Sequence, residues 1–169
     1  RYDYNNRIRE QWVTPTFWFL FKNQINASGG FFAVNNEEYE GIYHKNIHRA
    51  WINFNINSFS KATGGAYFEL GKFIARSESP SFIGYGFYGE TWLDIRPVDR
   101  LHSSFSYIYT ELSKETGGEK LYTGYILRNK TSFQFNKHLF LRVIFQYDSF
   151  DKNIQVDPLL SYKWNPFTI

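Results

Sequence analysis

The segment from Lys137 to Phe167 constrains the fold of this chain most strongly, because its apolar residues recur with a period of two. One parity of its first run is wholly apolar: Leu139, Leu141, Val143, Phe145 and Tyr147. The other parity carries Arg142, Gln146 and Asp148, together with Phe140 and Ile144. Successive side chains of a β-strand point to opposite faces, so this pattern predicts an amphipathic strand.

A second amphipathic run follows the polar residues 149–153 and ends at Asn165-Pro166. Leu160, Tyr162 and Trp164 share one of its faces. Two amphipathic strands with a short polar connection predict an antiparallel hairpin. The apolar face of this hairpin meets either a protein core or a lipid bilayer.

Similar alternation recurs through most of the chain, although some runs are interrupted. It is clearest from His48 to Phe59, where Ile52, Phe54 and Ile56 alternate with Trp51, Asn53 and Asn55. No segment repeats with the period of a helix. We therefore expect about nine strands, each about 10 residues long. A tilted transmembrane strand needs about 9 to 11 residues. Strands of soluble domains are usually shorter, at about 5 to 6 residues. The remaining expected strands cover residues 7–22, 24–35, 66–75, 87–96, 101–112 and 121–135, with a short, weak run at 39–44.

These strands predict an all-β fold, an antiparallel transmembrane β-barrel, with residues 1–169 forming a single barrel region. The expected lipid-facing residues are Leu139, Leu141, Val143, Phe145, Tyr147, Leu160 and Tyr162. The expected lumen-facing residues are Arg142, Gln146 and Asp148. The chain contains no Met, which predicts that residue 1 is an internal or processed position and that the barrel is larger than this segment.

Aromatic residues make up 21% of the chain, and two structural roles are open for them. Trp12, Trp51, Trp92 and Trp164 fall toward the ends of the expected strands, which favours aromatic girdles at the two membrane interfaces. Alternatively, aromatic side chains on one sheet face stack on sugar rings in a soluble, glycan-binding β-sandwich. The scattered positions of the tryptophans favour the girdles.

Several short motifs are better explained by structure than by chemistry. Gly84 to Gly89 matches G-x-G-x-x-G, but no helix is expected after it, so a bent or closely approached strand is favoured over a dinucleotide site. Two copies of S-K-x-T-G-G, at residues 60–65 and 113–118, predict glycine turns. Residues 35–38 predict a polar turn, and the four histidines are expected at surfaces or interfaces.

The sequence gives no support for an enzyme, a metal site or a cofactor. Glu90 and Asp94 share a strand face at a separation of about 13 Å, which exceeds the separation of glycosidase pairs. The absence of Cys excludes thiol chemistry and cysteine-based metal sites. The net charge of +3 is spread along the chain, so no nucleic-acid partner is expected. An enzyme whose site needs further residues is a weaker third option.

The final third of the chain contains a series of ordered blocks that include Asn129–Phe135, Leu139–Arg142, Gln146–Phe150, Asp157–Tyr162 and Asn165–Thr168. In these blocks it resembles a family of large Bacteroidota envelope proteins. Members are described as having an N-terminal module similar to carbohydrate-binding family 9 before a long β-rich region of unknown function. In that family the N-P-F-T segment continues into a further strand, so the resemblance implies that this chain is a fragment.

The expected function is therefore that of an outer-membrane β-barrel protein in a Gram-negative bacterium. Two roles fit: passage or docking of a substrate such as a saccharide, or a scaffold within an envelope complex. The expected partners are outer-membrane lipid, a saccharide and other envelope proteins. The rival is the soluble glycan-binding sandwich, at the cell surface or in the periplasm.

Overall fold

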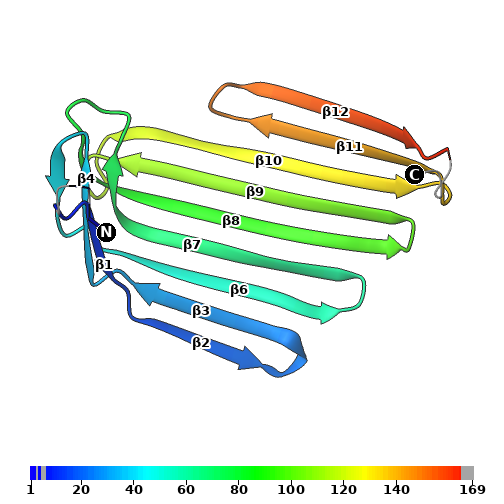
Figure 1. Ribbon diagram of the computed structural model, residues 1–169, viewed down its shortest axis with the longest axis horizontal. Helices are drawn as coiled ribbons and strands as arrows, with labels where there is room; N and C mark the ends of the chain where they lie inside the picture. Colours follow the sequence, from blue (N-terminus) through cyan, green and yellow to red (C-terminus); the bar gives the residue numbers. More distant parts are fainter. Residues whose placement is uncertain (3, 5–6, 165–169) are drawn as a thin grey trace.

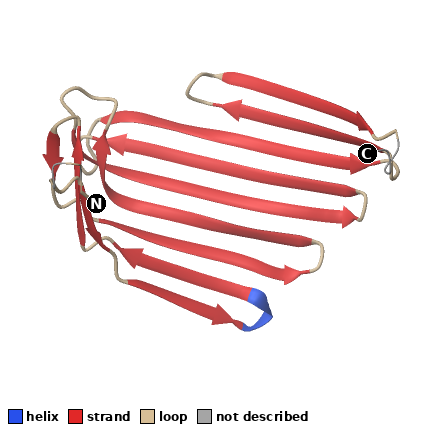
Figure 2. Cartoon of the chain, in the orientation of Figure 1, coloured by secondary structure: helices blue, strands red, loops and turns tan. Residues whose placement is uncertain are grey.

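The computed structural model describes residues 1–2, 4 and 7–164, so the N-P-F-T segment lies outside the described residues. The described chain is all-β and its sheets are antiparallel (Figure 2). Its one helical element is a 3-10 turn, η1 (Lys22–Gln24). No helix in the described part of the chain is long and apolar enough to span a membrane.

Nine strands form the main sheet, in the order β12-β11-β10-β9-β8-β7-β6-β3-β2 (Figure 1). Every neighbouring pair is antiparallel. The strands are β2 (Thr16–Phe21), β3 (Ile25–Phe31), β6 (Arg49–Phe59), β7 (Ala62–Ala75), β8 (Phe82–Val98), β9 (Leu101–Ser113), β10 (Lys120–Gln134), β11 (Leu139–Asp148) and β12 (Asn153–Tyr162).

A second sheet of three strands stands at one end of the main sheet (Figure 1). Its order is β1-β4-β5, with β1 (Glu10–Val13), β4 (Val34–Tyr39) and β5 (Ile42–His44). Only a few hydrophobic side chains of the described chain are buried, among them Ile47 and Leu112, each 1% exposed. No second layer of described strands covers either broad face of the main sheet.

The two ends of the main sheet differ in their connections. At one end the strands are joined by η1 and by residues 60–61, 99–100 and 135–138, and we call this end the short-turn rim. At the other end lie residues 32–48, which contain β4 and β5, and the connections 76–81, 114–119 and 149–152. We call this end the long-loop rim.

The C-terminal hairpin expected from the sequence is confirmed. β11 and β12 pair over their whole lengths, from Leu139 opposite Tyr162 to Asp148 opposite Asn153. The expected strand at residues 87–96 is also present but longer, because β8 begins at Phe82 and includes the G-x-G-x-x-G residues. A side chain at Gly84 or Gly86 would collide with the β9 backbone, which explains the glycines there.

Two expectations for the first third of the chain are wrong. The run 7–22 is not one strand, because it breaks at Thr14-Pro15 into β1 of the small sheet and β2 of the main sheet. Proline lacks the N–H that a continuous ladder needs. Residues 35–38 are not a turn but part of β4, and the chain reverses instead at Glu40-Gly41, where both residues have positive φ.

The two S-K-x-T-G-G copies do not share a structure. The second copy supplies residues 114–118 of the connection 114–119, and Gly117 adopts the expected positive φ of 73°. In the first copy only residues 60–61 turn, and Gly64 and Gly65 lie inside β7. A Cβ atom on Gly65 would be 2.3 Å from the Trp92 ring, so this glycine makes room for a side chain of β8.

Candidate functional site

The main sheet has one almost continuous apolar face. Directly opposed residues of an antiparallel pair share a face, so the pairing can be followed across the sheet. One such row runs from β12 to β2 through Ile154, Tyr147, Leu127, Tyr107, Thr91, Ala66, Phe54, Ala27 and Phe19. We call this side the apolar face.

The residues that the sequence marked as lipid-facing all lie on the apolar face. They are Leu139, Leu141, Val143, Phe145 and Tyr147 of β11 and Leu160 and Tyr162 of β12. Several side chains of this face are well exposed, including Phe19 at 55% and Leu160 at 65%. That this face meets lipid stays a prediction.

The apolar residues form a band of nearly constant height. The band covers Leu139–Tyr147 in β11, Tyr125–Phe133 in β10, Leu101–Tyr109 in β9 and Phe87–Ile95 in β8. Each stretch is about nine residues long, within the range of about 9 to 11 that a tilted strand needs to cross the hydrocarbon of a bilayer.

A small polar cluster interrupts this band. Ser103, Asn129 and Thr131 lie on the apolar face, and their side chains bond to one another. Ser103 Oγ is 2.7 Å from Thr131 Oγ1, Asn129 Nδ2 donates to Ser103 Oγ at 3.0 Å, and Thr131 Oγ1 donates to Asn129 Oδ1 at 3.0 Å. The cluster meets most of its own hydrogen-bonding needs, which lowers the cost of placing it in apolar surroundings.

The opposite side of the sheet, the polar face, carries amides, hydroxyls and charges. One row contains Gln155, Gln146, Arg128, Ser106, Trp92, Gly65, Asn55 and Asn26. Arg142, Gln146 and Asp148, which the sequence marked as lumen-facing, all lie on this face. That the polar face lines a lumen stays a prediction.

Two glutamates of the polar face accept hydrogen bonds from neighbouring tyrosine side chains. Tyr67 donates to Glu69 at 3.0 Å and Tyr88 donates to Glu90 at 3.1 Å. Glu69 also forms an ion pair with Arg49. Glu69 and Glu90 therefore each have a side-chain partner on this face.

Aromatic rings on the polar face form a connected row. Trp51 stacks on Tyr67 with ring centroids 6.1 Å apart, and Tyr67 meets Tyr88 edge-on at 6.0 Å. Trp92 packs over Gly65, and the Trp51 indole packs over Gly30, so glycines of adjacent strands accommodate both tryptophans.

Two of the four tryptophans expected in the girdles do not share the apolar face. A girdle residue needs its ring at the lipid interface, whereas Trp51 and Trp92 lie on the polar face. Trp12 lies in β1 of the small sheet. Trp164 lies just beyond β12, is 87% exposed and contacts the Tyr162 ring at 5.8 Å, so it alone has a position that suits a girdle.

Tyrosines on the apolar face form a row, and of its members the sequence marked only Tyr147 as lipid-facing. Tyr125 contacts Tyr107 at 5.8 Å and Tyr147 at 5.7 Å. Their shared parity with the apolar residues of each strand is the signal that could have identified them. They lie toward the long-loop rim, where an interfacial belt would run.

A further tyrosine of the apolar face, Tyr109 of β9, shows how the apolar band ends. Tyr109 donates to Glu111 at 2.7 Å, and Lys120 donates to the same carboxylate at 2.8 Å. Hydrogen bonds from Lys120 and Tyr109 lower the pKa of Glu111, whose carboxylate in turn raises the pKa of Lys120. The Tyr109 ring thus lies in the apolar band, while its hydroxyl reaches the polar groups at the long-loop rim.

A pocket lies between the small sheet and the polar face at the long-loop rim, and we call it the mouth pocket. Its aromatic residues are Trp12, Phe32, Trp51 and Tyr67, and Glu10 and Glu37 add carboxylates. Thr14 also lines it, and its Oγ1 is buried without a hydrogen-bond partner in the described chain. Flat rings beside hydroxyl and carboxylate groups can bind a ligand that has both apolar faces and hydroxyl groups.

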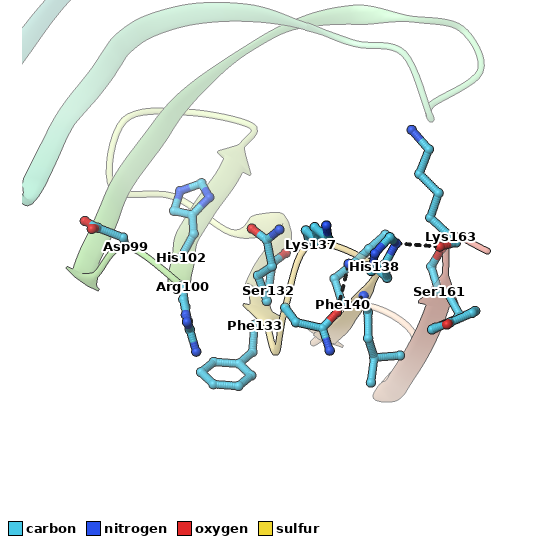
Figure 3. A pocket seen from close by; sticks show the side chains of 14 residues that line it. Asp99, Arg100, His102, Ser132, Phe133, Lys137, His138, Phe140, Ser161 and Lys163 are labelled. Carbon is cyan, nitrogen blue, oxygen red and sulfur yellow. Dashed lines mark hydrogen bonds between the residues drawn. The ribbon is translucent and has the colours of Figure 1, made fainter. Parts of the chain in front are cut away.

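A second pocket lies at the short-turn rim (Figure 3). Its lining comes from the β8–β9 turn, the β10–β11 turn and the end of β12, with Arg100, Lys137 and Lys163 as its cations. His138 Nδ1 lies 2.9 Å from the Lys163 carbonyl oxygen, and this contact links the β10–β11 turn to the end of β12.

The histidines and acidic residues singled out in the sequence have structural partners. His44, expected at a surface or an interface, is buried and bonds to Ser81 at 3.0 Å. Glu37 and Glu38 pair with Arg76 and Arg9, each at 2.7 Å. Within the described chain no group of three His, Asp or Glu side chains could hold a metal ion.

Comparison with known proteins adds no relatives. No family model, curated protein or solved structure matches this chain.

Proposed function

We propose that this chain forms part of the wall of an outer-membrane β-barrel, with the apolar face toward lipid and the polar face toward a lumen. The observation that carries the proposal is the apolar band, which continues across neighbouring strands with a height close to that of bilayer hydrocarbon. The resemblance of the C-terminal blocks to Bacteroidota envelope proteins supports the same location.

Energetics favour lipid over water as the medium for this face. Burying apolar surface is worth about 25 cal/mol per Å², and soluble monomers rarely expose contiguous apolar patches larger than a few hundred Å². Phe19, Phe54, Phe145 and Leu160 are exposed on this face on four separate strands, which favours lipid as its surroundings.

The sheet suits a barrel that contains further strands. The nine strands alternate in direction, so the edge strands β2 and β12 run the same way. Joining these two edges would create a parallel pair. A closed antiparallel barrel built on this sheet therefore needs an odd number of additional strands, which gives the even total of bacterial barrels.

The lumenal role that the side chains support best is passage or docking of a saccharide. Trp51, Tyr67 and Tyr88 offer neighbouring rings, and the adjoining amides and carboxylates offer hydrogen bonds. The soluble glycan-binding sandwich would use the same rings. It would also need a second sheet over the apolar face, and the described residues contain none large enough.

Single-cysteine labelling tests the proposed membrane orientation directly, because the chain has no Cys of its own. Val143→Cys and Gln146→Cys place a thiol on opposite faces of β11. In vesicles, a polarity-sensitive label at 143 should show a blue-shifted emission and be quenched by a lipid-soluble quencher. A label at 146 should be quenched by aqueous iodide, and identical behaviour at both positions would contradict the proposal.

A further inference from the structure

Positive charge is concentrated at the short-turn rim. Its connections and the residue after β12 carry five exposed cations: Lys22, Lys61, Arg100, Lys137 and Lys163. Among the described residues of these connections, Asp99 alone carries a carboxylate side chain. The imbalance is local, since the long-loop rim mixes both signs of charge.

The five cations are not neutralised by the described chain. The ion pairs of Lys and Arg lie at or near the long-loop rim, as in Arg76–Glu37 and Lys120–Glu111. No described carboxylate forms an ion pair with any of the five. Lys61 instead donates to the Pro97 carbonyl at 3.1 Å, and Arg100 donates to that of Phe135 at 3.4 Å.

These cations lie where the apolar band ends. Lys22 follows Phe21, and Lys163 follows Tyr162, the last apolar-face residue of β12. Arg100 directly precedes Leu101, where the band of β9 begins. Long basic side chains that leave an apolar surface extend their charged ends into the interfacial layer, which is where lipid phosphates lie.

The short-turn pocket combines the two properties that a lipid headgroup needs (Figure 3). Arg100, Lys137 and Lys163 bring positive charge from three separate segments. Phe133 and Tyr162 line the same pocket with apolar surface and belong to the apolar face. A phosphate attached to acyl chains matches this arrangement better than a free anion, because the apolar surface adjoins the cations.

We propose that the short-turn rim binds the phosphate groups of anionic phospholipids. This inference rests on the proposed membrane location. Short turns face the periplasm in bacterial barrels, so the lipids concerned are those of the periplasmic leaflet. Each basic residue near an anionic lipid surface contributes to the attraction, and five of them produce a strong lipid preference.

Electron spin resonance of spin-labelled lipids tests the inference with the full chain reconstituted in phosphatidylcholine vesicles. The measured quantity is the association of spin-labelled phosphatidylglycerol with the protein relative to spin-labelled phosphatidylcholine. The rim variant K22Q/K61Q/R100Q/K137Q/K163Q removes the five charges. The matched control K45Q/R76Q/K114Q/K120Q/K152Q removes five exposed charges from the long-loop rim.

We expect the wild type and the control to prefer phosphatidylglycerol about tenfold and the rim variant to lose this preference. Equal association of both lipids with the wild type, or a preference that survives in the rim variant, overturns the inference while the membrane location stands. Loss of the preference in excess inorganic phosphate at constant ionic strength would assign the site to free phosphate instead. The absence of any protein-associated lipid signal would refute the membrane location itself.

Discussion

The hydroxyl groups of Ser103 and Thr131 lie 2.7 Å apart on adjacent strands, within a mainly apolar face. Asn129 bonds to both of them. We predict that Thr131→Val destabilises the protein by about 1 to 3 kcal/mol, because it leaves polar groups of Ser103 and Asn129 unpaired.

The triple variant S103A/N129L/T131V is the control, since removing all the partners together is close to neutral or stabilising. Urea unfolding in detergent micelles measures both variants. If the triple variant were as unstable as Thr131→Val, unpaired polar groups would not be the cause.

Val143 and Gln146 of β11 provide a second matched pair, on opposite faces of one strand. An Arg side chain at the bilayer midplane on the lipid face costs about 2 to 4 kcal/mol, whereas a lumenal Arg is tolerated. We therefore expect Val143→Arg to impair folding into vesicles far more than Gln146→Arg. The folded fraction on unheated gels measures this, and equal effects would reverse the facial assignment.

The alternation of side chains was sufficient to predict most of the main sheet, since both faces of β6 and β11 follow from a period of two. It could not predict where the chain leaves the sheet. The run 7–22 looks continuous, but Pro15 separates β1 from β2. A period of two says nothing about which sheet a strand joins, so the small sheet and the mouth pocket were missed.

The tryptophans show a second limit of the sequence. Their positions near the strand ends suggested a girdle, but the parity of Trp51 and Trp92 assigned them to the polar side. The structure places both on that polar face, so position along a strand and parity point to different roles for them. The contacts with Gly30 and Gly65 join different strands, so they depend on register, which one sequence does not reveal.

Gly65 supports the Trp92 ring, and this contact is testable. A Cβ atom there would be 2.3 Å from the ring and 2.4 Å from the Phe54 carbonyl oxygen. We expect Gly65→Ala to cost about 1 to 3 kcal/mol through overpacking and to shift the tryptophan emission. Gly118→Ala is the control, because its nearest contacts are 3.3 Å or longer within its own turn. Wild-type stability and emission in Gly65→Ala would rule out the contact.

Acid should weaken the contact of Glu111 with Lys120 and Tyr109. The pKa of Glu111 lies below its ordinary value of 4.5, so its contribution to stability is present above pH 4.5 and is lost as the pH falls through the lower, folded-state pKa. The pKa of Lys120 is raised above 10.5, so its contribution is lost only as strong base deprotonates it.

The stability difference between the wild type and Glu111→Gln should therefore be constant from about pH 5 to 10 and shrink below that range. Urea midpoints measured at a series of pH values test this. A difference that grew on acidification would show that the carboxylate is not stabilised by these partners.

The stacked rings of Trp51 and Tyr67 make the saccharide role testable at one position. An oligosaccharide array probed with the detergent-solubilised chain should give signals that Trp51→Ala reduces at least tenfold, because a flat ring on the polar face is lost. Trp164→Ala is the matched control, since Trp164 is 87% exposed and lies beyond the end of β12. Equal losses of signal in both variants, or the absence of any ligand on the array, would contradict a saccharide role. Neither result would affect the proposed membrane orientation, because that orientation rests on the apolar face alone.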